Sequence, residues 1–461
     1  MIAMLWGNPE FRRNVLCEFS ASRLLVDPLL IGLTLAVMVS SESDVKGIVI
    51  GISQIGFIFL TVIWGARQAG KAFSREFAEG TWDGQRMSGL TPWQMTWGKL
   101  LGSTLNAWYD GAIMMALFLI AVSIKENLYI AVLGALGWIG FAVAIHVINM
   151  IQILFNRDRL VQQRRLSSLI VFAILLFGWG VGSFAYDTDV FTLVQKIHWW
   201  GIEFSGAFFA VASVLAMSAW AVTALWQAMR RELLERNHPG WWLAFLLFWL
   251  FWAMGLLVRP DASSKSWPLF FLACALVAWG SVYPPLLISR KDPGYWLHLF
   301  TAWQRRDRAL LLHLFPNWIT SIALGLILSL VAELSATVLQ SDRSSLSFPA
   351  MLLSSPLVLI PFVIRDVAIV LWFNLAPRAK APDGAALVVL AVLYLLIPLL
   401  LDIGKGNPSI LYYAFIPGIF HEHSSSGALI CGTFFPLLQA AGALFLLRLR
   451  WQTHWAAAAR S

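Results

Sequence analysis

Long apolar segments follow one another along almost the whole chain, and they constrain its fold more than any other feature. Hydrophobic residues fill 59% of the 461 positions and charged residues 13%, whereas soluble domains are about half apolar and a quarter charged. A helix needs about 20 apolar residues to cross a bilayer. The sequence therefore predicts an all-α polytopic membrane protein with about twelve transmembrane helices, at residues 26–40, 47–66, 100–122, 128–155, 167–185, 204–228, 241–258, 267–288, 317–339, 349–374, 385–402 and 426–447.

Basic residues are divided unequally between the two sides that these spans define. An excess of Lys and Arg marks the cytoplasmic side of a membrane protein. We therefore expect a multi-pass protein of the bacterial inner (plasma) membrane, with both termini and residues 74–99 in the cytoplasm. Among 33 Lys and Arg residues, this orientation leaves Arg365 within a span and only the following outside: Lys46, Lys125, Lys196, Arg259, Lys265, Arg343 and Lys405.

The segment between the second and third predicted spans carries a strong helix-start signal. Thr91 is a good N-cap, Pro92 suits the first turn of a helix, and Gln94 completes a capping box. Leu90 and Met95 have the spacing of a hydrophobic staple. Such a cap stabilises a helix by about 1 kcal/mol. We expect it to fix the turn that leads from a cytoplasmic helix into the third span.

A weaker copy of this segment recurs in the second half of the chain. Thr301, Trp303 and Gln304 repeat the spacing of the capped segment, and the alignment continues without a gap to pair Trp108 with Trp318. An even number of spans, six in each half, returns the chain to the same side of the membrane, so the two halves can be parallel repeats. We predict two parallel six-helix repeats, residues 1–236 and 237–461; chance similarity in a chain rich in Leu and Trp is the alternative.

Four short motifs lie close together in the first copy: Arg75-Glu76, Glu79-Gly80-Thr81, Thr91-Pro92 and Gly98-Lys99-Leu100-Leu101. Together they resemble the cytoplasmic signature of type-2 ATP-binding-cassette (ABC) exporter permeases, and the similarity covers residues 74–103. The second half departs from this pattern, because Asp292-Pro293-Gly294 stands where the first half has Trp82-Asp83-Gly84.

This resemblance implies a permease subunit of an ABC exporter rather than an enzyme. A separate cytoplasmic ABC ATPase, expected in two copies, would bind ATP and Mg and drive translocation. The sequence does not identify the substrate; a lipid or another hydrophobic molecule is compatible with the apolar spans. The lipid bilayer is the other expected partner. Whether a second permease or an accessory subunit also binds stays open. We expect no nucleic acid, and no cofactor or metal bound by this chain. The implied coupling residues are Glu76, Phe77, Glu79, Gly80, Thr81, Gly84, Leu90, Thr91 and Pro92, with a second coupling segment at Trp296, Thr301, Trp303 and Gln304.

Charged residues within predicted spans are further candidates for function, since each costs about 2.5–3.5 kcal/mol at the centre of a bilayer on insertion scales. Asp110 and Glu333 are candidates for a translocation pathway, and a helix–helix hydrogen bond is the alternative for Asp110. The Arg365-Asp366 pair is expected to snorkel toward the surface or to pair across helices.

Other motifs predict less. Residues 65–72 nearly match a phosphate-binding loop, but Ala72 replaces the hydroxyl that Mg²⁺ needs and a span precedes the motif. His421-Glu422-His423 offers too few ligands for a convincing metal site. Three separated cysteines predict no disulfide framework. Amphipathic surface helices are predicted at 9–25 inside, and at 190–204 and 411–420 outside.

Two other function classes stay open. A polytopic membrane enzyme acting on lipid-linked substrates would need acidic or His residues clustered on one membrane face, and no such cluster is evident. An ion-coupled secondary transporter would have buried charges mirrored in the two halves, whereas Asp110 aligns with the uncharged Thr320. The presence or absence of an ATPase subunit in the purified protein separates the exporter from both alternatives.

Overall fold

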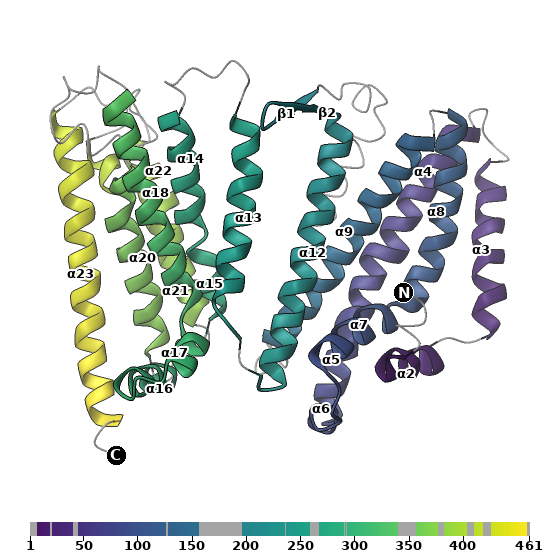
Figure 1. The fold of residues 1–461 in the computed structure, drawn as a ribbon, viewed down its shortest axis with the longest axis horizontal. Coiled ribbons are helices and arrows are strands. Elements are labelled where there is room, and N and C mark those ends of the chain that lie inside the picture. Colours follow the sequence, from purple (N-terminus) through teal and green to yellow (C-terminus); the bar gives the residue numbers. More distant parts are fainter. Residues whose placement is uncertain are drawn as a thin grey trace. The chain divides into compact units, whose positions relative to one another are not determined.

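The protein is an all-α polytopic membrane protein, as the apolar segments predict (Figure 1). The computed structural model describes residues 7–18, 21–39, 45–125, 128–155, 196–235, 237–258, 267–289, 291, 293–339, 356–376, 382–402, 410–417 and 426–458. Within this part, nine helices are long and apolar enough to cross a membrane: Val45–Ala78, Leu105–Ile124, Leu128–Leu154, Gly206–Glu232, Phe270–Leu287, Asn317–Ala336, Pro356–Asn374, Pro382–Leu401 and Cys431–Thr453.

The nine helices match nine of the predicted spans. Two shorter apolar helices, Leu24–Val37 and Gly240–Leu256, lie at the predicted spans 26–40 and 241–258. The remaining predicted span, 167–185, lies outside the described residues. The count of twelve and the internal repeat therefore stay predictions.

The chain divides into two compact units, Met1–Ile197 with Ile202–Asn237, and His198–Gly201 with His238–Ser461. In the first unit α9 packs against α12 and α5, α4 against α8, and α2 against α7. Its helices are α2 (Pro9–Glu18), α3 (Ala21–Val39), α4 (Val45–Phe57), the π-helical η1 (Ile58–Trp64), α5 (Gly65–Ala78), α6 (Trp82–Arg86), α7 (Pro92–Gly102), α8 (Leu105–Lys125), α9 (Leu128–Phe155) and α12 (Gly206–Glu232).

In the second unit α14 packs against α18, and α20 against α23 and α21. The break between α14 and α15 lies beside two prolines, Pro284 and Pro285, which cannot donate helical hydrogen bonds. Its helices are α13 (Gly240–Leu257), α14 (Trp267–Gly280), α15 (Tyr283–Ile288), α16 (Pro293–Gln304), α17 (Arg308–Leu314), α18 (Asn317–Leu339), η5 (Pro356–Val358), α20 (Leu359–Asn374), α21 (Pro382–Ala391), η6 (Val392–Leu396), α22 (Ile397–Asp402), η7 (Ile410–Ala414) and α23 (Ser426–Ala458).

One helix continues from a membrane span into the polar end of the first unit. It runs through α4, η1 and α5 over Val45–Ala78, so residues 65–72 are helical and form no loop. The π-helical section η1 is held by its neighbours: the Thr61 hydroxyl donates to the Ala107 carbonyl at 3.2 Å, and His146 Nε2 lies 2.7 Å from the Thr61 carbonyl oxygen. Gly111 allows this close approach, because a Cβ there would collide with Thr61.

The predicted surface helices agree with the structure only in part. Residues 9–18 form the helix α2, but α3 starts a new helix at Ala21. The described part of 190–204 is a hairpin of β1 (Ile197–Trp199) and β2 (Ile202–Phe204), so the predicted helix is wrong there. Trp200 and Gly201 both have positive φ, the conformation of a two-residue hairpin turn. At 411–420 the described residues form only the short 3₁₀ turn η7.

Candidate functional site

The loop between α5 and α7 forms a well-defined protrusion, residues 79–91, which we call the tip. It contains the short helix α6 and lies at the same end of the first unit as α2 (Figure 1). Two glycines, Gly80 and Gly89, have φ of 69° and 71° and so turn the chain where another residue would be strained. At the end of α5 the Thr81 N–H donates to the Glu76 carbonyl at 3.0 Å, the long bond of a Schellman motif.

The predicted cap after the tip is confirmed. Thr91 precedes α7 in an extended conformation, its hydroxyl accepts the Gln94 N–H at 3.2 Å, and the Gln94 side chain accepts the Thr91 N–H at 3.0 Å. Pro92 occupies the first turn of α7. Leu90 and Met95 lie in one hydrophobic cluster, where Met95 is fully buried, as the staple requires. The turn from the tip into α7 is thus fixed by local bonds.

Aromatic rings anchor the tip from inside. Trp82, at the start of α6, is only 1% exposed although its neighbours Thr81 and Asp83 are exposed. Its ring packs edge-on against Phe73 at 5.6 Å and Phe77 at 5.2 Å between centroids, both from α5. Edge-to-face pairs of this kind contribute about 0.5–1.5 kcal/mol beyond the burial of their area. The tip is therefore a rigid extension of α5.

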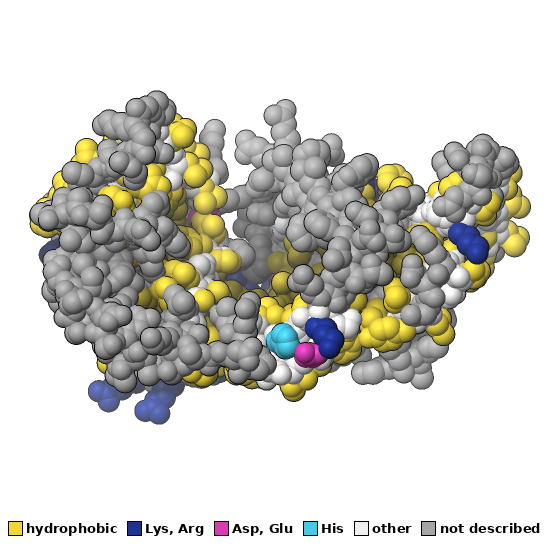
Figure 2. Space-filling model, turned by 90° about the horizontal axis from the view of Figure 1, so that it is seen from above, with side chains coloured by type: hydrophobic (Ala, Val, Ile, Leu, Met, Phe, Trp, Pro, Cys, Tyr) yellow, Lys and Arg dark blue, Asp and Glu magenta, His cyan; other side chains and the backbone are white. Residues whose placement is uncertain are grey.

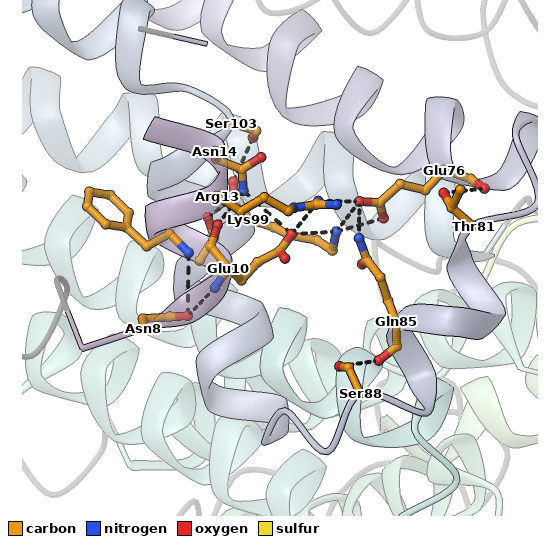
Figure 3. A network of polar contacts seen from close by, with 12 residues as sticks. Asn8, Glu10, Arg13, Asn14, Glu76, Thr81, Gln85, Ser88, Lys99 and Ser103 are labelled. Carbon is orange, nitrogen blue, oxygen red and sulfur yellow. Dashed lines mark hydrogen bonds and ion pairs between the residues drawn. The ribbon is translucent and has the colours of Figure 1, made fainter. Parts of the chain in front are cut away.

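A buried ion-pair network lies beneath the tip, where α2, α5 and α7 meet (Figure 3). The Lys99 ammonium is 3.0 Å from a Glu10 carboxylate oxygen and 2.6 and 2.7 Å from the two oxygens of Glu76. The side chains of Lys99, Glu10 and Glu76 are 1%, 4% and 9% exposed. Lys99 Nζ also lies 5.4 Å from the Phe73 ring centre and 5.6 Å from that of Trp82, so the ionic and aromatic groups adjoin.

Arg13 and Gln85 complete the network. One Arg13 nitrogen contacts Glu10 and Glu76, each at 2.9 Å, so two basic groups balance two carboxylates. Partial burial lowers the pKa of Arg13, but the attraction of Glu10 and Glu76 outweighs this and the net shift is upward. The Gln85 amide donates to Glu76 at 2.6 Å, which ties α6 to the network. Because a buried charge is costly without its partner, these contacts depend on one another.

Two asparagines fasten α2 onto α7. Asn8 caps α2 by accepting the Glu10 N–H at 3.1 Å, and its amide donates to the Gln94 carbonyl at 2.7 Å. The Asn14 amide donates to the Gly98 carbonyl at 3.3 Å. Gly98 permits this contact, since a Cβ there would lie 2.7 Å from Glu10 Cβ. The N-terminal helix is thus a structural part of the site.

The structure divides the predicted coupling residues into two groups. One group faces outward: Glu79, Gly80, Thr81, Gly84 and Thr91 are exposed, and Phe77 and Leu90 are half-buried. The other faces inward: Pro92 is buried, and Glu76 binds Lys99, Arg13 and Gln85. Glu76 is one of the implied coupling residues, yet its carboxylate is engaged inside the protein.

The predicted second coupling segment is built differently from the first, because no capping box forms at Thr301. Thr301 lies within α16, and its hydroxyl donates to the carbonyls of Leu297 and His298 at 2.9 Å each. The next cap is Asp307, which accepts the Leu310 N–H at 3.0 Å and starts α17. Because Asp is a strong N-cap, the start lies at this residue instead. Trp303 and Gln304 are exposed, and Trp296 is half-buried.

The Arg365-Asp366 pair, which was predicted within a span, is buried and forms hydrogen bonds with neighbouring helices. Arg365 and Asp366 bond to each other at 2.9 Å inside α20. The hydroxyls of Tyr283 and Tyr394 donate to Asp366 at 2.7 Å each, and Arg365 donates to Gln439 at 2.6 Å. The pair therefore joins helices rather than reaching the surface.

Asp110 in α8 and Glu333 in α18 are half-buried and belong to different units. A pathway role for either residue stays a prediction. The described part of the chain holds no group of three His, Cys, Asp or Glu residues arranged for a metal ion, and residues 421–423 lie outside it.

Glu10 and Arg13 were not predicted as site residues. Lys99 belongs to the motif Gly98-Lys99-Leu100-Leu101. Nothing in the sequence predicts that it is buried with two carboxylates, because Glu10 precedes it by 89 positions. Comparison with protein-family models, with curated proteins and with solved structures gives no match. A functional assignment therefore rests on the residues and geometry of this chain.

Proposed function

We propose that this chain is the permease subunit of an ABC exporter and that the tip docks on a separate cytoplasmic ATPase. The observation that carries the proposal is the combination of an exposed polar surface with a rigid attachment to the membrane helices. Glu79, Gly80, Thr81 and Asp83 are exposed on the tip. Trp82 and the buried network hold that surface on α5, which continues into a span, and on α7, which leads into α8.

This arrangement suits the transmission of force. A partner that moves the tip also moves α5 and α7, because the buried ion pairs resist separation of the two helices. The alternative is an ordinary loop whose basic residues only mark its side of the membrane. Such a loop needs neither a capping box nor a buried Lys99. The motifs at residues 75–101 support the same function, and the ATPase partner would supply ATP and Mg.

The direct test is to purify the full-length chain from its native membranes and measure nucleotide hydrolysis after reconstitution into liposomes. We expect ATP hydrolysis by a companion subunit, and transport that depends on it. Full transport activity of the isolated chain without any companion would contradict the proposal.

A charge reversal at the tip tests the docking surface. Glu79 is 50% exposed and, among the described residues, pairs with its neighbour Arg75 at 2.8 Å. Glu79→Lys should therefore leave insertion and folding intact but weaken association with the ATPase, roughly ten-fold, since like charges across an interface repel. The readout is the ATPase activity that co-purifies with the tagged chain.

A closely matched control exists at the base of the β1–β2 hairpin, where Lys196 and Glu203 both belong to the first unit. Glu203 is 48% exposed and pairs with Lys196 at 2.6 Å, so Glu203→Lys makes the same change in a similar environment. β2 and the start of α12 lie at the end of the first unit's helices opposite the tip (Figure 1). Seen from that end, most of the coloured side chains are hydrophobic (Figure 2). Equal activity losses in the two variants would rule out the tip as the docking surface.

A further inference from the structure

The helix α16 exposes large apolar side chains at the end of the second unit. Leu297, Phe300 and Trp303 are 48%, 38% and 66% exposed. The opposite side of α16 is attached to the protein, since Ala302 is 1% exposed and Trp296 packs on Trp318. The helix therefore presents a fixed apolar surface, and in Figure 1 it lies across the ends of α20 and α23.

Basic side chains border this apolar surface. Arg305, Arg306 and Arg308 follow α16 directly, and all three are exposed. None of them forms an ion pair with a described side chain. Leu312 within α17 and Phe315 at its end, 44% and 37% exposed, extend the apolar side chains along this helix. Basic groups beside exposed aromatic and aliphatic groups are the pattern of a surface that binds anionic phospholipid.

The tip of the first unit has the opposite character. Its exposed side chains are mainly polar or absent, and Met87 is the exception. Its large aromatic residue, Trp82, is buried, whereas Trp303 of α16 is exposed. On α16, by contrast, a stacked Phe300–Trp303 pair is exposed beside three arginines.

We propose that α16 and the start of α17 rest on the anionic phospholipid surface of the cytoplasmic leaflet. The guanidinium groups of Arg305, Arg306 and Arg308 contact headgroup phosphates, while Leu297, Phe300 and Trp303 enter the boundary of the acyl chains. α16 then serves as a membrane anchor of the second unit. This inference goes beyond the proposed function and does not require an ATPase.

Site-directed spin labelling of the full-length chain tests this assignment. The background is Cys17→Ser, because Cys17 is exposed whereas Cys274 and Cys431 are buried. One label replaces Trp303, and a second, at Leu297, leaves Trp303 in place. A label at Met87, 83% exposed on the tip, is the control. The chain is placed in nanodiscs of phosphatidylcholine with or without phosphatidylglycerol.

Collision of each label with oxygen and with a water-soluble nickel chelate is then measured. We expect the labels at 303 and 297 to favour oxygen, and the label at 87 to favour the chelate. A label at 303 as accessible to the chelate as the label at 87 would overturn the proposal. It would leave α16 as a candidate second docking surface for the ATPase.

The requirement for anionic lipid is tested separately. Each basic residue near such a surface contributes roughly a five-fold preference. Arg306→Gln should therefore lower the ratio of embedded to water-exposed label at 297 about five-fold with phosphatidylglycerol, and little without it. Arg75→Gln, which removes an exposed charge from the first unit, should leave the ratio unchanged. Equal ratios in both lipids and in the Arg306 variant would overturn the anionic specificity.

Discussion

Lys99 shows how much a single residue contributes to this structure. Its ammonium contacts two carboxylates and adjoins two aromatic rings, while 1% of its side chain is exposed. Replacing a whole buried ion pair by apolar groups is often neutral, but removing one partner leaves an uncompensated charge. Because each of these groups needs its partners, we expect the network to favour the packing of α2, α5 and α7 that brings Lys99, Glu10 and Glu76 together.

Removing the ammonium should destabilise the protein strongly. Lys99→Met leaves Glu10 and Glu76 together with only Arg13 to balance them, so the free energy of unfolding should fall by about 3–5 kcal/mol. Thermal unfolding of the full-length chain in detergent measures the change. In Lys196→Met, which breaks an exposed pair, the loss should be much smaller, because exposed ion pairs contribute little to stability. Similar losses in both variants would contradict the structural role of Lys99.

At the scale of elements, the decisive contact is that of α2 with α7. It combines a buried ion pair, two asparagine bonds and the absence of a side chain at Gly98. A Cβ at residue 98 would lie 2.7 Å from Glu10 Cβ and 3.1 Å from the Phe11 backbone nitrogen. Since the second group is backbone, the whole helix must move to accommodate a methyl group.

Gly98→Ala should therefore separate α2 from α7. Overpacking of this kind costs about 1–3 kcal/mol, which should lower the thermal midpoint by several degrees. Gly84→Ala is the matched control, since nothing lies within 4 Å of its added methyl group and alanine favours a helix. An unchanged midpoint in Gly98→Ala would show that α2 is not held in this way.

Elements governed by neighbouring residues could be predicted from the sequence. The box at Thr91 depends on Gln94 three positions away, and it is present as expected. The second copy repeats the Thr and Gln of this box, yet Thr301 lies inside α16, and Asp307 is the cap that determines the start of α17. The hairpin was missed because Trp200 adopts a positive φ that its residue type does not favour.

For the whole molecule, the apolar segments alone predict a helical membrane protein, because lipid requires every backbone group to bond within the helix. The same information cannot predict the buried network. Arg13 and Glu76 are 63 positions apart. The sequence contains many other pairs of oppositely charged residues that could form an ion pair equally well. Only the packing of α2 on α7 selects these partners.

Orientation in the membrane is a property of the whole molecule and can be measured with a native residue. Cys17 is exposed on α2, whereas Cys274 and Cys431 are buried. With the N-terminus in the cytoplasm, a membrane-impermeant maleimide should label the chain only after the membrane is opened. Glu203→Cys in a Cys17→Ser background should instead react in intact cells. The reverse pattern would place residues 74–99 outside and refute the proposed docking.

The helix over Val45–Ala78 is about 50 Å long at the usual rise per residue, and it includes a single π-helical section, η1. Such a widened turn lacks the regular bonding that keeps the rest of the rod straight. Bending is therefore expected to concentrate at Ile58–Trp64, where it has to shift the contacts of Thr61 with Ala107 and His146. Movement of residues 79–91 would thus change how η1 packs against α8 and α9.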